Sequence, residues 1–127
     1  SVFNAYIHAY PAKEQEQRIN SYIAVAALHD RDYEAAVNAY DKIDELDDHM
    51  VLNYMKANYL RANQLVKNGS YRLAIPCLKA AAYYSDRSSR FNQLSRFWLA
   101  ESYYRNEQYR DALTTYTDLY VVWTRGT

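Results

Sequence analysis

Apolar residues recur along most of this chain at intervals of three and four, the spacing of a helix with one buried face. In the segment EQYRDALTTY, for example, Tyr109, Ala112 and Tyr116 fall on one side of a helix. The pattern predicts an all-α fold with about seven helices separated by short turns. The expected helices cover 2–10, 14–30, 33–46, 50–68, 71–85, 90–106 and 109–123.

The pattern repeats with a period of 38 residues, which relates Tyr33, Tyr71 and Tyr109. Two sets of small residues keep the same register: Ala24, Ala62 and Ala100, and then Ala36, Ala74 and Ala112. Each unit is therefore predicted to be a helix, a short turn and a second helix. The alanines let the two antiparallel helices approach closely, and a Tyr or Leu one turn later fills the space beside them.

The turns inside the units also coincide, at 30–32, 68–70 and 106–108. They contain Asp, Asn or Gly, which tolerate the left-handed conformation that ends a helix. The expected helix caps are Asp32, Ser70, Asp48 and Ser89. Pro76 lies inside one predicted helix, where we expect it to produce a kink and to point outward.

Two stretches of the third unit resemble a known family. LAESY (99–103) is similar to the L-G-x2-Y part of the tetratricopeptide pattern, and ALTTY (112–116) to its A-x3-F part. The period exceeds that family's, which is about 34 residues. The resemblance implies a bacterial-type array, a right-handed α-solenoid forming one domain over 1–127 and cut from a longer protein. Its parts would be a partial helix at 2–10 and repeats at 14–48, 50–86 and 90–124.

In such an array, the first helices of successive units line a concave groove. Residues four apart on these helices share a face. The predicted groove residues are Ser21, Val25 and His29, then Tyr59, Asn63 and Lys67, then Phe97, Glu101 and Arg105. Alternatively, Tyr59 and Phe97 pack between units. Some family members hold a C-terminal carboxylate on this face, but only Asn63 resembles their ligand set.

The net charge is zero, but its distribution is uneven. Residues 1–48 hold four Lys/Arg and ten Asp/Glu, a charge of −6, and residues 49–127 hold eleven and five, a charge of +6. The asymmetry is compatible with two differently solvated surfaces, with head-to-tail stacking, or with an acidic partner at the basic end. We also predict self-association through the last helix, whose Leu119, Val122 and Trp123 have no following helix to cover them.

No pattern indicates catalysis, a cofactor or a metal. His8, His29 and His49 match no ligand spacing, and the acidic run 44–48 lacks the glycine of a calcium loop. Cys77 is a lone filler residue. No apolar run approaches the roughly 20 residues of a membrane helix, so we expect no direct membrane insertion.

The functional hypothesis is a scaffold that binds a peptide or protein segment in the groove and is not an enzyme. One alternative is a sensory or assembly segment of a larger envelope or regulatory protein. YIHAYP and FWLAESYY are similar to repeats of bacterial envelope proteins, which favours the periplasm or envelope over the cytoplasm. A second alternative is RNA binding by helical repeats, but the acidic first third lacks the required basic stripe. We therefore expect no nucleic-acid partner.

Overall fold

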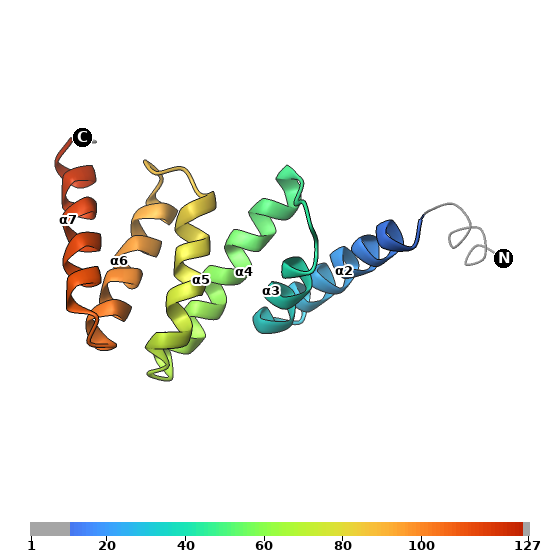
Figure 1. Cartoon of the computed structure of the whole chain (residues 1–127), viewed down its shortest axis with the longest axis horizontal. Helices are drawn as coiled ribbons and strands as arrows, with labels where there is room; N and C mark the ends of the chain where they lie inside the picture. Colours follow the sequence, from blue (N-terminus) through green and yellow to red (C-terminus); the bar gives the residue numbers. More distant parts are fainter. Residues whose placement is uncertain (1–10, 126–127) are drawn as a thin grey trace. The chain divides into compact units, whose positions relative to one another are not determined.

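The computed structural model describes residues 11–125, and in this range the regular structure consists of six α-helices and no strands (Figure 1). The helices are α2 (Ala12–His29), α3 (Tyr33–Asp41), α4 (Asp48–Lys67), α5 (Tyr71–Tyr84), α6 (Arg90–Arg105) and α7 (Tyr109–Arg125). The predicted all-α class is confirmed for this range. The helix expected over 2–10 lies outside the described residues.

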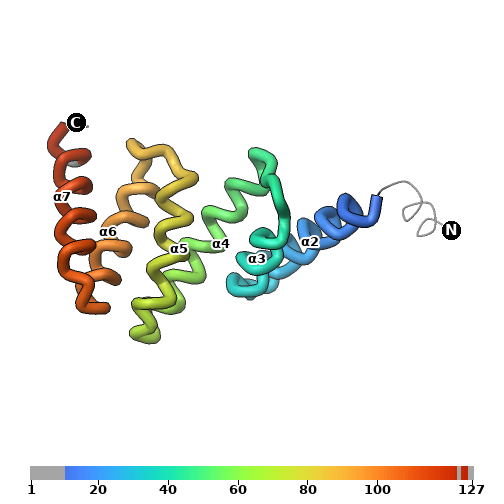
Figure 2. Tube along the Cα trace, viewed as in Figure 1, coloured from blue at the N-terminus to red at the C-terminus, as the bar shows by residue number. Residues whose placement is uncertain are grey.

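The chain forms two compact units that divide between Tyr54 and Met55, inside α4. In the first unit, α2 and α3 pair in opposite directions (Figure 2). In the second unit, α5, α6 and α7 lie side by side, and each runs opposite to its neighbour. Neighbours in sequence are therefore neighbours in space within each unit.

The three turns inside the helical pairs have the same backbone structure. Arg31, Gly69 and Glu107, each 38 residues from the next, have positive φ angles of 59°, 74° and 62°. In each turn the following N–H donates to the carbonyl oxygen five residues back, as Ser70 does to Leu65 at 2.8 Å. These are Schellman helix ends. The predicted register is thus present in the backbone as well as in the side chains.

The turns predict opposite effects for two substitutions. Gly69→Ala should lower the free energy of unfolding by about 1 kcal/mol, because a side chain is strained at positive φ. Apart from Gly69 itself and its two chain neighbours, no heavy atom lies within 4 Å of the position of an added Cβ, so the cost comes from the backbone alone. Glu107→Gly should raise stability by about 0.5 kcal/mol, since relief of strain exceeds the added entropy of the unfolded chain. Urea unfolding measures both, and changes of the same sign would contradict the assignment.

Side-chain caps begin several helices. Asp32 accepts from the N–H of Ala35 at 3.1 Å, and the Ser89 hydroxyl accepts from the N–H of Asn92 at 3.1 Å, which confirms both predicted caps. Ser70 stands at the start of α5, but its side chain makes no capping bond. The expectation for Ser70 was therefore right in position and wrong in its hydrogen bond.

The helix predicted over 33–46 is shorter than expected and ends at Asp41. The last turn contains no basic residue, and Asp41 and Asp44 place negative charge at the helix end that disfavours it. Asp44 instead forms an ion pair with Lys13, with Nζ and Oδ2 2.6 Å apart. This contact joins the loop after α3 to the start of α2.

The cap of α4 is one residue earlier than predicted. The Asp47 carboxylate accepts from the N–H of Met50 at 2.8 Å, while Asp48 is the first residue of the helix. Both aspartates favour a helix start, because its free N–H groups carry partial positive charge. Sequence alone did not distinguish between them.

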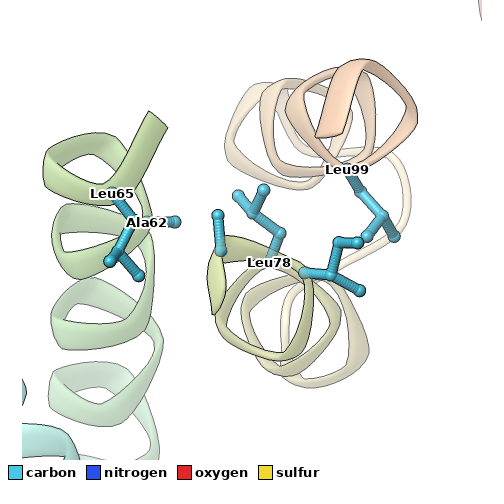
Figure 3. Packing of buried hydrophobic residues seen from close by; sticks show 6 residues of the cluster. Ala62, Leu65, Leu78 and Leu99 are labelled. Atoms are coloured by element: carbon cyan, nitrogen blue, oxygen red, sulfur yellow. The ribbon is translucent and has the colours of Figure 1, made fainter. Parts of the chain in front are cut away.

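The core of the second unit brings together side chains from three helices. Ala62 and Leu65 of α4, Leu78 of α5 and Leu99 of α6 point toward one another (Figure 3). All six alanines of the two predicted small-residue sets are buried, as expected. Pro76 is exposed and α5 continues through it, which confirms its outward position.

The core of the first unit is built around a tyrosine. Tyr40 is buried with Ala24, and its ring meets that of Tyr54 edge to face at 6.1 Å between centroids. The Tyr54 hydroxyl donates to Asp41 at 2.5 Å. Tyr54 therefore adds ring area to the core while its polar end reaches a carboxylate at the surface.

Candidate functional site

The predicted groove residues of the first unit lie on α2. Val25 and His29 are exposed, and Ser21 is half-buried. Ser21 lines a hollow of about 310 Å³ together with acidic side chains that include Glu45 and Asp47. This part of the predicted site is therefore accessible and has an acidic margin.

The two aromatic groove residues of the second unit already make contacts inside that unit. The Tyr59 ring lies 5.1 Å from that of Phe91 and packs against the core cluster. The Phe97 ring contacts Trp98 at 5.3 Å and Tyr116 at 6.4 Å. Both side chains are half-buried. The Tyr59 contact joins two successive repeats, as the alternative interpretation from sequence expected, whereas both Phe97 contacts lie within one repeat.

The polar groove residues of the second unit have different surroundings. Glu101 accepts a hydrogen bond from the Tyr116 hydroxyl, and burial together with this carboxylate raises the pKa of Tyr116 to about 12. Arg105 lies over the ring of Tyr71, 6.0 Å from its centroid. The other two members are Asn63, which is half-buried, and Lys67, which is exposed. Lys67 and Arg105 thus remain available at the surface.

A different group of residues surrounds a cleft of about 470 Å³ formed by α5, α6 and α7. This volume lies within the range of ligand sites, roughly 300–1,000 Å³. The side chains that could contact a ligand are Lys79, Tyr83, Arg87, Asn92, Arg96, Leu99 and Asp118. Three are cations and one is an anion, so the cleft is electropositive. Leu99 and Tyr83 add apolar surface.

Arg96 is the most unusual of these residues because its charged side chain is buried. Its guanidinium approaches one acidic group, Asp118, at 3.6 Å, and Asp118 is itself exposed. Burial and the nearby charge of Arg87 lower the pKa of Arg96, while Asp118 acts in the opposite direction. A buried cation whose ion pair, among the described residues, is with one solvent-exposed carboxylate is incompletely compensated. An additional anion in the cleft would stabilise it.

The 38-residue register shows that this buried charge is particular to the third repeat, 90–124. The positions equivalent to Arg96 hold Asn20 and Asn58, and both are buried. A neutral amide therefore occupies this position in the other two repeats. The buried arginine is consequently not required by helical packing as such.

Asn92 places a second polar group in the cleft. Its side-chain nitrogen donates to the carbonyl of Ala82 at 2.8 Å and to the Ser85 hydroxyl at 3.0 Å. Its side-chain oxygen is buried and has no partner among the described residues. Because buried acceptors are normally satisfied, this oxygen could accept a hydrogen bond from a bound amide. The cleft therefore offers both an acceptor and cations.

Sequence reasoning missed the cleft residues. The one available signal was the departure of Arg96 from the asparagines at its equivalent positions. Within residues 11–125, no group of three or more His, Cys, Asp or Glu side chains is arranged to hold a metal ion. None of the helices in the same range combines the length and hydropathy needed to cross a bilayer.

No protein-family model matches the chain, and no curated protein or solved structure is significantly similar to it. The tetratricopeptide resemblance therefore stays a prediction from sequence. Function has to be inferred from the residues and their geometry.

Proposed function

We propose that the chain is a non-catalytic protein-interaction module, built as a tetratricopeptide-like solenoid, that binds a peptide segment of a partner protein. The observation that supports this most is the electropositive cleft around the buried Arg96. Such a cleft suits recognition, because a bound ligand would give the buried cation a second charged partner and the unpartnered amide oxygen a first one.

The chemistry of the cleft defines the ligand. A carboxylate side chain would lie near Arg96 and Lys79, and an apolar side chain beside Leu99 and Tyr83. A peptide N–H would donate to the free oxygen of Asn92. The ligand is thus an amphipathic segment of modest acidity. Its affinity should be about micromolar, because the contact area is small.

The predicted groove on the first helices is the alternative surface for the same function. Its Asn63 and Lys67 are available, but Tyr59 is partly used in packing against Phe91. A Tyr59→Ala variant would therefore affect stability as well as binding. Asn63→Ala is the cleaner test of that surface.

Selection from a displayed random peptide library tests the proposed cleft. The wild-type chain should enrich peptides that place Asp or Glu next to Leu or an aromatic residue. Arg96→Asn, the residue of the equivalent positions, should weaken binding of the enriched peptides by at least about tenfold, because a hydrogen bond to a charged group contributes roughly 1.5–3 kcal/mol. Fluorescence anisotropy on synthetic copies of these peptides measures the loss.

Arg110→Asn is the matched control, because Arg110 is exposed on α7 and does not line the cleft. Equal binding by wild type and Arg96→Asn would exclude the cleft, provided that both have the same helical circular dichroism. Loss of binding with Asn63→Ala instead would assign the function to the groove. Salt-dependent binding of single-stranded RNA that Arg96→Asn abolishes would replace the peptide proposal with RNA recognition.

A further inference from the structure

One face of α7 is apolar and uncovered. Tyr109, Leu113 and Tyr120 are exposed, and Leu113 has 68% of its surface accessible. The repeat register shows what normally covers this face. The residue equivalent to Leu113 is Ile75 of α5, which is 9% accessible and lies in one cluster with Leu99 of α6. The open face of α7 thus corresponds to the face of α5 against which the next helix, α6, packs.

One face of α2 is uncovered in a complementary way. Ile19, Tyr22 and Ile23 are exposed, and Ile23 is 48% accessible. Its equivalent in α6 is Leu99, which is 8% accessible because it packs in the cluster with Ile75. The open face of α2 thus corresponds to the surface with which α6 packs onto the preceding helix. The two exposed faces are the two halves of one kind of interface.

We infer that copies of this chain associate head to tail, with α2 of one copy packed on α7 of the next. The α5–α6 contact inside the second unit is the template for this interface. Tyr22 and Ile23 would take the places of Trp98 and Leu99, and Leu113 the place of Ile75. The occupant of the α7 face is therefore a second copy of this chain.

Charge favours the same orientation. Residues 11–48 carry −6 and residues 49–125 carry +6, because all charged side chains of the chain lie within these ranges. In a head-to-tail arrangement, the acidic part of one copy faces the basic part of the next. The helices α2 and α7 are each neutral in Asp, Glu, Lys and Arg. The charges therefore orient the approach at long range, and the apolar faces form the contact.

The face differs from the one predicted from sequence. Leu119 was expected to be uncovered, but it is buried within the chain. Val122 is half-buried, and the side chain of Trp123 lies outside the described residues. The exposed stripe passes through Leu113 and Tyr120 instead, because the inner face of α7 is already packed against α6.

A head-to-tail contact uses two different surfaces, so association need not stop at a dimer. Sedimentation velocity at increasing concentration should show a series of oligomers. Ile23→Glu and Leu113→Glu each remove one surface, and each alone should weaken self-association by at least about tenfold. An equimolar mixture of the two variants should form a dimer and nothing larger, because one intact surface remains on each.

Leu73→Glu is the matched control, since Leu73 is an exposed leucine on α5 that belongs to neither surface. It should associate like the wild type. Circular dichroism establishes that all variants are folded, as expected for exposed positions. A wild-type chain that stays monomeric at the highest concentrations overturns the inference. So does an Ile23→Glu variant that still forms dimers, since that result indicates a symmetric contact between two α7 helices.

Discussion

Leu78→Ala should lower the free energy of unfolding by about 2–5 kcal/mol, the range for removing a large buried side chain and leaving a cavity. Leu78 has no accessible surface. It lies between side chains of α4 and α6 (Figure 3), so three helices would lose contacts together. Urea unfolding monitored by circular dichroism measures the change.

The matched control is Leu73→Ala on the same helix, because Leu73 is 48% accessible. Its effect should stay within about 0.5 kcal/mol. The two leucines differ in burial and not in helix propensity. Equal effects of the two substitutions would mean that Leu78 does not lie in the core of the second unit.

Ala62→Leu should lower the free energy of unfolding by about 1–3 kcal/mol, because added methylenes have no space in a close-packed core. Ala62 is fully buried in the cluster with Leu65 and Leu78. Ala24 and Ala100, its equivalents in the 38-residue register, are fully buried as well. The same substitution at these positions should have a similar cost.

Ala26→Leu on α2 is the control for added volume, because Ala26 is exposed. Thermal unfolding at low protein concentration separates the effect from self-association. A melting temperature of Ala62→Leu that matches the wild type would contradict the close contact at this position. An effect at Ala62 without effects at Ala24 and Ala100 would contradict the structural equivalence of the three repeats.

Much of the helical arrangement was predictable because it depends on local spacing. The alanine positions and the turns at Arg31, Gly69 and Glu107 all follow one register, and the structure buries or bends them accordingly. The end of α3 was not predictable from spacing. Apolar residues continue to Ile43, but the helix stops at Asp41, where the charges of the following loop oppose it.

The cleft was harder to predict from the sequence, for a different reason. Helical geometry places residues on one face of one helix, and the predicted groove was chosen in that way. The cleft combines Lys79, Arg96 and Asp118 from three helices. Which of their faces meet depends on the packing between helices, which spacing along a single helix does not determine. The one signal in the sequence was Arg96, which stands where the other two repeats have asparagine, and the prediction did not use it.

The local character of both cores has a consequence for folding kinetics. Each cluster joins helices that follow one another along the chain. Closing short connections has a low entropic cost, and folding rates rise as contacts become more local in sequence. Either core can therefore form before the other, because neither requires contacts with residues at the opposite end of the chain. Stopped-flow refolding should be rapid for a chain of this length.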